Sequence, residues 1–208
     1  MTDAIGAGTV PEEAMRRYLV QDHKFLDAFV ALLSSMVSKA PSLEDRIPGC
    51  QFLALITGKE NTYFERSMTR LGVTDEDRSH PPLPVAQAFI DLMRGAAGGS
   101  LAEMLSVLIV AEWSYLEWAV RVHPARSADA PFWCAEWIDL HRGEYFEGVV
   151  AYLRGLLDRI APGLPRSELA RARARFAEAI GLERAFWDMA WGPPSQEKGP
   201  RAPEESEG

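Results

Sequence analysis

Apolar residues along this chain recur at intervals of three and four, the spacing at which side chains share one face of an α-helix. Prolines and glycines separate these periodic segments, and Ser100 with Glu103 has the sequence of a capping box, which starts a helix. The pattern predicts six long helices, with a kink near Gly143 in the fifth, over residues 11–39, 48–71, 84–97, 100–122, 131–160 and 165–191. No segment shows a competing alternation typical of β-strands. The predicted fold class is all-α, a bundle of long helices.

The breaks in the pattern also predict the domain organisation. A length of 208 residues suits one domain with a substantial core. We expect residues 1–10 to be a flexible N-terminal extension and residues 11–192 to be one helical domain. Residues 193–208 are rich in Pro, Glu, Ser, Gly and Lys, a composition that predicts a disordered tail.

Four carboxylates interrupt the apolar helix faces. Each lies at a position that should face the core, and they are Asp22, Glu60, Glu112 and Glu183. A buried carboxylate is costly unless it is paired, hydrogen-bonded or protonated. Their recurrence on four predicted helices indicates a polar cavity inside the bundle.

The composition limits the class of partner. The chain is 47% hydrophobic and 25% charged, with a net charge of −8 and a pI of about 5.1, which argues against nucleic acid as a partner. It has no run of 18 apolar residues, and its N-terminus lacks a basic start followed by an apolar run. We therefore expect no membrane partner and a cytoplasmic location.

Carboxylates inside a helical bundle suit two kinds of chemistry. A di-iron site would use Glu-x-x-His pairs, and the sequence contains none, so we expect no metal and no cofactor. The other is acid/base catalysis, because carboxyl groups in an aromatic cavity have raised pKa values and transfer protons near neutral pH. Aromatic residues such as Tyr63, Phe89 and Phe186 lie on the same faces and, together with carboxylates, suit a flat heterocycle that carries an amino group. Aromatic stripes also occur in ordinary cores, so the pattern alone leaves both interpretations open.

Four strings carry a family resemblance. Residues 18–26 contain an adjoining Gln and Asp, residues 100–117 a long central helix, residues 137–146 a Trp-Ile pair with a later Phe, and residues 181–190 a Glu before Phe-Trp and Met. In this order they resemble the TenA/thiaminase II family of the Thi-4/TenA/PqqC-like superfamily, from about Gly8 to Gly192. The resemblance implies a helical bundle similar to haem oxygenase and a hydrolase of thiamin salvage that binds an aminopyrimidine. By the matched motifs, Asp22 would bind the pyrimidine amino group and a ring nitrogen, Glu183 would be the acid/base group, and Tyr115 would orient Glu183 or the ligand.

The departures from the family pattern define a branch. The family's central helix carries Pro-Cys, with the nucleophilic thiol, where this chain has Val110 and Ala111. Glu112 follows, which resembles the Glu-type branch, TenA_E, that lacks the cysteine and is associated with formylaminopyrimidine and aminopyrimidine. His141 and Phe25 stand where the family has tyrosines. Residues 6–11 resemble the loop after the family's first helix, so we expect that helix to be missing.

The resulting hypothesis is an enzyme that hydrolyses a degraded thiamin pyrimidine by carboxylate acid/base catalysis without a cysteine nucleophile. The alternative is a pyrimidine-binding or regulatory protein without turnover, and a weaker third interpretation is an oxidase-like relative. The expected partner is a small pyrimidine, and relatives of this kind lead us to expect a homodimer or homotetramer. The predicted catalytic residues are Glu183, Glu112 and Tyr115, and the predicted substrate-binding residues are Asp22, Phe25, Glu60, Tyr63, Phe89, His141 and Phe186.

Overall fold

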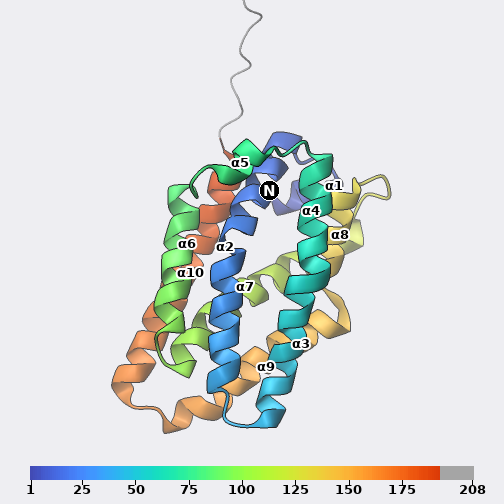
Figure 1. The fold of residues 1–208 in the computed structure, drawn as a ribbon. Coiled ribbons are helices and arrows are strands. Elements are labelled where there is room, and N and C mark those ends of the chain that lie inside the picture. The colour runs from blue at the N-terminus through green and yellow to red at the C-terminus, as the bar shows by residue number, and fades with distance from the viewer. Residues whose placement is uncertain (193–208) are drawn as a thin grey trace, which may run out of the picture.

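The computed structural model describes residues 1–192, which form a helical bundle without a β-strand in that range (Figure 1). In Figure 1, α2 lies between α6 and α10 on one side and α3 and α4 on the other, and α7 crosses behind α2 in contact with it. The all-α prediction is confirmed.

In chain order the elements are α1 (Thr2–Ala7), α2 (Glu12–Lys39), α3 (Leu43–Leu55), the π-helix η1 (Ile56–Glu60), α4 (Asn61–Arg70), α5 (Asp75–Ser79), α6 (Pro84–Ala97), α7 (Leu101–Val122), the 3₁₀ turn η2 (His123–Ala125), α8 (Phe132–Leu140), α9 (Gly143–Ile160), the 3₁₀ turn η3 (Ala161–Gly163) and α10 (Arg166–Trp191).

Helix α7 is the central element of the bundle, because α2, α6, α8, α9 and α10 all pack against it. The Ser100 side chain accepts from the Glu103 backbone N–H, and the Glu103 carboxylate accepts from the Ser100 backbone N–H, which is the predicted capping box. The Glu103 carboxylate also accepts from Arg171 on α10 at 2.9 Å. The start of α7 is therefore fixed both to its own first turn and to the C-terminal helix.

Two of the predicted helices are divided in the structure. The predicted helix 131–160 is two helices, α8 and α9, and Gly143 has a φ of 81°, which only glycine adopts readily. The predicted helix 48–71 begins earlier, at Leu43, because the Ser42 side chain caps it by accepting from the Asp45 N–H. It is then interrupted by η1 before α4. The loop predicted near residues 73–84 contains the short helix α5.

The N-terminal residues differ from the expected flexible extension. Thr2–Ala7 form α1, which packs against α7 and α8 and buries Ile5 completely. Gly8 ends the helix with a φ of 70°, and the Val10 N–H donates back to the Ala4 carbonyl. Burial of one apolar side chain and closure of the helix end thus order a segment that is too short for a periodic signal. The predicted tail, residues 193–208, lies outside the described residues.

Of the helices in residues 1–192, none combines the length and the apolar character that crossing a membrane requires.

Candidate functional site

A pocket lies inside the bundle between α2, η1, α7 and α10. It contains about 460 Å³ of atom-free space, part of it solvent at the mouth. Its lining combines acidic, aromatic and aliphatic side chains, and no lysine or arginine contributes to it. The lining residues are Asp22, Phe25, Leu26, Phe29, Ile56, Glu60, Phe64, Met93, Ala111, Glu112, Tyr115, Trp137, His141 and Glu183.

The four carboxylates that interrupt apolar helix faces all line this pocket. Asp22 comes from α2, Glu60 from η1, Glu112 from α7 and Glu183 from α10, and each residue is at most 9% exposed. Within residues 1–192, no ion pair reaches any of them, because the charged partners in the structure pair elsewhere. The sequence argument for an interior polar cavity therefore matches the position of these side chains.

The π-helix η1 positions two lining residues. Ile56 and Glu60 are its first and last residues, and both are buried against the pocket. A π-turn places one extra residue in the helical turn, and such turns occur frequently at functional sites. The local geometry lets α3 and α4 continue on either side while Glu60 reaches the interior.

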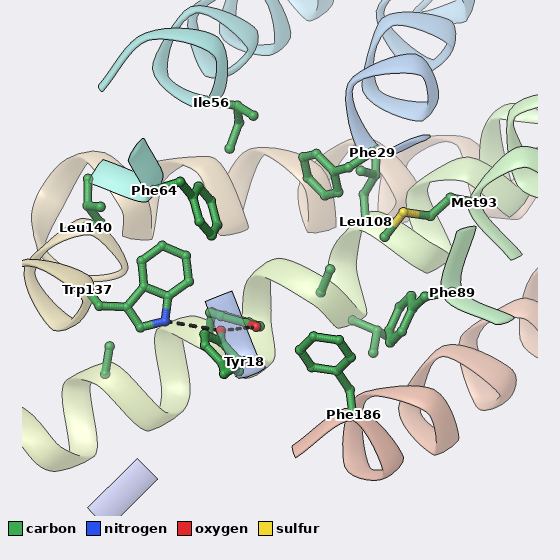
Figure 2. Packing of buried hydrophobic residues seen from close by; sticks show 14 of the residues in the cluster. Tyr18, Phe29, Ile56, Phe64, Phe89, Met93, Leu108, Trp137, Leu140 and Phe186 are labelled. Atoms are coloured by element: carbon green, nitrogen blue, oxygen red, sulfur yellow. Dashed lines mark hydrogen bonds between the residues drawn. The ribbon is translucent and has the colours of Figure 1, made fainter. Parts of the chain in front are cut away.

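Aromatic side chains form one wall, and hydrogen bonds link three of them. The Trp137 Nε1–H donates to the Tyr18 hydroxyl at 3.1 Å, and the Tyr18 and Tyr115 hydroxyls are 2.6 Å apart. Figure 2 shows Tyr18 between Trp137 and Phe186, with the dashed bond from the Trp137 nitrogen. Tyr115 and Trp137 face the pocket, whereas Tyr18 lies behind them and is fully buried.

His141 contributes a neutral acceptor to the pocket. Its Nδ1 lies 2.8 Å from the Trp137 carbonyl oxygen, which can only accept, so Nδ1 carries the proton in the neutral ring. Burial lowers the pKa of His141 to about 4, in spite of this backbone hydrogen bond. At neutral pH the ring is therefore uncharged, and Nε2 carries a lone pair.

The structure brings most of the predicted site residues together and places three others behind the wall. Tyr63 stacks on Trp137 with ring centroids 4.8 Å apart and donates to the Trp133 carbonyl, so its hydroxyl is already used. Phe89 and Phe186 pack against Phe25, at 5.6 and 5.4 Å, rather than against the pocket space. All three are buried, which fits the helical spacing that suggested them, but they support lining residues instead of forming the lining.

Sequence reasoning assigned no site role to Trp137, although it lies in the Trp-Ile string and lines the pocket. The aliphatic lining residues Leu26, Ile56 and Met93 had no distinguishing signal, because their spacing is that of any core residue. Only the tertiary arrangement separates a pocket wall from a packed core.

Burial raises the pKa of every pocket carboxyl, and for the three glutamates the charges of neighbouring acids add to this effect. The pKa of Asp22 is raised to about 8 by burial, and a hydrogen bond from Tyr18 opposes the increase. Burial first, then the charges of Glu183 and Asp22, raise the pKa of Glu112 well above its ordinary value. Burial and the charge of Asp22 also raise the pKa of Glu183. Burial and the charges of Glu112 and Asp22 raise the pKa of Glu60. Burial therefore favours the protonated form of these acids in the ligand-free pocket, and a protonated carboxyl can donate a proton.

These pKa values predict how stability depends on pH. At the pocket carboxyls the folded protein binds more protons than the unfolded chain above about pH 4, so their contribution to the free energy of unfolding falls as pH rises towards the folded pKa values. Between pH 6.5 and 8 the folded His141 is neutral, because its pKa is lowered to about 4, whereas in the unfolded chain, with an ordinary pKa of 6.5, it releases about half a proton, which offsets a small part of the loss from the acids. Each carboxyl that stays protonated contributes up to about 2 kcal/mol of this loss. Urea unfolding of the ligand-free protein at pH 6.5 and at pH 8 measures this loss in the free energy of unfolding. We expect Asp22→Asn to reduce the loss. A flat profile would contradict buried, protonatable acids.

Neither cysteine lines the pocket. Cys50 is exposed, and Cys134 is buried in α8 with a thiol whose pKa burial raises to about 12. In the part of the chain that the structure describes, no group of three or more His, Cys, Asp or Glu side chains has an arrangement that could hold a metal ion. The arrangement can bind a flat ligand and move protons with carboxyl groups.

Fold and site together define a class: an all-helical bundle that encloses an acidic, aromatic pocket. The chain belongs to the TENA/THI-4/PQQC family, whose model matches residues 1–192, and the resemblance seen in the sequence is thereby confirmed. An aminopyrimidine aminohydrolase of Halalkalibacterium halodurans is 27% identical over 190 residues, which cover 90% of this chain and 84% of that protein. A protein of the same name from Helicobacter pylori is 23% identical over 189 residues, covering 90% and 87% of the two chains.

Solved structures share the fold. A TenA homologue from Pyrococcus furiosus has a TM-score of 0.80 with 23% identity, covering 91% of this chain and 89% of the other. A protein described as a TenA family transcription regulator, from Silicibacter, has a TM-score of 0.78 with 22% identity, covering 92% and 88%.

Proposed function

We propose that this protein is a hydrolase of thiamin salvage that cleaves a C–N bond of a 4-amino-2-methylpyrimidine, with carboxyl groups as acid and base. The observation that carries the proposal is the convergence of four buried carboxyls and an aromatic wall on one pocket. Relatives named aminopyrimidine aminohydrolase match about nine-tenths of the chain and support the choice of substrate.

Asp22 is the group that would hold the pyrimidine ring. A carboxyl can bridge an exocyclic amino group and the adjacent ring nitrogen, because one oxygen accepts while the other donates or accepts. Phe25, next to Asp22 in the lining, offers an aromatic surface for the flat ring. The absence of lysine and arginine from the lining favours a neutral or cationic ligand over an anionic one.

Glu112 and Glu183 would divide the acid and base roles. Their charges interact, so one can be protonated while the other is ionised. The ionised carboxylate takes a proton from a water molecule while the oxygen of that water attacks the carbon of the C–N bond. The protonated carboxyl gives its proton to the leaving nitrogen. On an amine the products are an alcohol and ammonia, and on a formamide they are an amine and formate. Tyr115 lies beside both groups and would orient one of them or the ligand.

Turnover assays test this function directly. Purified protein is incubated with the pyrimidine carrying an aminomethyl arm or a formylaminomethyl arm, and the pyrimidine product, ammonia and formate are quantified. We expect product from at least one of the two. No product from either overturns the enzyme assignment.

The alternative function is pyrimidine binding without turnover, and the specific observation in its favour is the methyl group of Ala111 in the pocket where the family carries a thiol. A rise in melting temperature with both pyrimidines, together with no product, would select this alternative. Assembly as a homodimer or homotetramer and a cytoplasmic location stay predictions, and light scattering at several protein concentrations tests the first.

A further inference from the structure

His141 holds its imidazole ring in a fixed orientation at the pocket. It is the residue directly after α8, is 4% exposed and lines the pocket. Its Nδ1–H donates to the Trp137 carbonyl oxygen at 2.8 Å. The imidazole also packs against three aromatic rings, with centroid distances of 4.2 Å to Trp137, 4.8 Å to Tyr115 and 5.1 Å to Phe146. One backbone hydrogen bond and three ring contacts therefore fix the positions of both ring nitrogens.

The second ring nitrogen, Nε2, is open to the pocket. It has no hydrogen-bond partner within residues 1–192. In that range, the side-chain polar atoms that are sealed inside the protein without a partner are Ser67 Oγ and Trp118 Nε1, and Nε2 of His141 is not among them. An unpartnered atom that is not sealed borders open space, and the space that this ring lines is the pocket. The Nε2 lone pair is therefore available to a molecule bound there.

This acceptor differs from the other polar groups of the lining. The carboxyls accept when they are ionised and donate when they are protonated, and the Tyr115 hydroxyl can do either. The Trp137 Nε1–H is already used by Tyr18. Burial lowers the pKa of His141 to about 4, so at neutral pH its ring is uncharged and Nε2 can only accept. A bound ligand must therefore place a donor at Nε2 or leave a buried lone pair unpaired.

The proposed function leaves one ligand group to supply that donor. A pyrimidine with an aminomethyl or formylaminomethyl arm carries N–H groups at two places, the amino group on the ring and the nitrogen of the arm. Asp22 would take the ring amino group, so the arm nitrogen remains for Nε2. His141 also contacts Tyr115, which lies beside Glu112 and Glu183, the two groups to which the reaction is assigned. In both reactions the arm nitrogen is the leaving group.

We propose that His141 is a specificity-determining residue whose Nε2 accepts a hydrogen bond from the N–H of the leaving nitrogen. The inference rests on the proposed function for its choice of ligand. The proton stays on the ligand nitrogen, so His141 gains no charge and takes no part in bond breaking. The nitrogen lone pair stays free to receive a proton from a pocket carboxyl. A formyl oxygen at the same place would set two acceptors against each other, so the contact also determines which way the amide lies.

Two matched ligands isolate this hydrogen bond. One is the 4-amino-2-methylpyrimidine with a formylaminomethyl arm, which has an amide N–H, and the other carries a methyl group in place of that hydrogen. Calorimetry gives both dissociation constants in Glu183→Gln, where we expect too little turnover to disturb the measurement. We expect His141→Phe in this background to reduce the preference for the N–H ligand by about 10–100-fold, because one buried acceptor is no longer left unpaired by the methylated ligand. The bulk of the methyl group cancels, since both proteins meet it.

A second variant separates the pocket acceptor from the backbone hydrogen bond. His141→Asn keeps an N–H for the Trp137 carbonyl but removes Nε2, so it should reduce the preference as much as His141→Phe does. His80→Phe is the matched control, because His80 is exposed and lies outside the pocket, and its preference should equal that of the parent protein. A preference that is unchanged in both His141 variants overturns the inference. So does a loss confined to His141→Phe, which would assign the effect to the backbone hydrogen bond.

Nitrogen-15 NMR of the histidine rings tests the acceptor directly. In the ligand-free wild-type protein at pH 7, we expect His141 Nδ1 to carry a proton and Nε2 to carry none. In Glu183→Gln, the N–H ligand should move the Nε2 resonance in the direction of a hydrogen-bonded nitrogen, and the methylated ligand should not. A proton on Nε2 in the free protein, or the same shift with both ligands, contradicts the inference.

The failure of this inference and the failure of the proposed function are distinguishable. If the wild-type protein yields no pyrimidine product, the proposed function fails, while the dissociation constants and the NMR spectra still measure the contact at His141. If the wild-type protein is active but neither His141 variant changes the preference for the N–H ligand, only the inference fails.

Discussion

Glu183→Gln lowers kcat on the aminopyrimidine by roughly 10²–10⁴-fold, the range that general acid/base catalysis contributes. Glu183 enters the pocket from α10, is 9% exposed, and has a pKa that burial and Asp22 raise well above the ordinary value. Glutamine keeps the size and shape of the side chain, with an NH₂ group in place of one carboxyl oxygen, but it cannot transfer a proton. We therefore expect KM to change much less than kcat, because in the proposed function Asp22, not Glu183, holds the pyrimidine ring.

Steady-state kinetics over pH 5–9 measure this effect, with circular dichroism to verify the fold. Glu178→Gln is the matched control on the same helix, since the Glu178 side chain is 53% exposed and pairs with Arg175 at the surface. That variant should retain the wild-type rate. A Glu183→Gln rate within about threefold of wild type would remove Glu183 from the acid/base role, given the size that such roles have.

The helical periodicity correctly predicted that the acids are buried, because a helix fixes which side chains share a face. Asp22, Glu112 and Glu183 each stand among apolar residues at the right spacing, and each is buried in the structure. Spacing also fixed the cap of α7 at Ser100, since capping needs only residues within one turn. Local chemistry of this kind is visible in a sequence.

The parts that the sequence did not predict depend on contacts between distant segments. The sequence placed Glu60 on a core-facing helix stripe but did not predict the π-turn η1 that carries it into the pocket, because no local residue pattern distinguishes that turn from a continuing helix. Tyr63, Phe89 and Phe186 have the spacing of buried residues, but whether a buried ring faces a pocket or a neighbouring ring depends on helices far apart in the chain. The hydrogen bond between Tyr18 and Tyr115 likewise joins residues that are 97 positions apart in the chain.

Glu112→Gln should lower kcat to a similar degree, roughly 10²–10⁴-fold, if this carboxyl rather than a thiol carries the chemistry. Glu112 is 7% exposed on α7, and the adjacent Ala111 places a methyl group in the pocket. The charge of Glu183 raises its pKa, so the two acids titrate as a pair and the bell-shaped pH profile belongs to both. In Glu112→Gln one limb of the profile should disappear, because only one carboxyl of the pair still titrates.

The same variant separates carboxylate catalysis from thiol catalysis when a cysteine control accompanies it. Cys50 is exposed and outside the pocket, and Cys134 is buried with a pKa raised to about 12, so neither supplies a thiolate to the ligand. Cys50→Ala, and the wild type after treatment with iodoacetamide, should therefore retain full turnover while Glu112→Gln loses it. Inactivation by the alkylating reagent, combined with an active Glu112→Gln, would assign the reaction to a thiol. The opposite pair of results argues against a thiol nucleophile and turns the question to whether water or a pocket carboxylate attacks. A single turnover in ¹⁸O-labelled water separates these two, because the label enters the enzyme only if a carboxylate attacks.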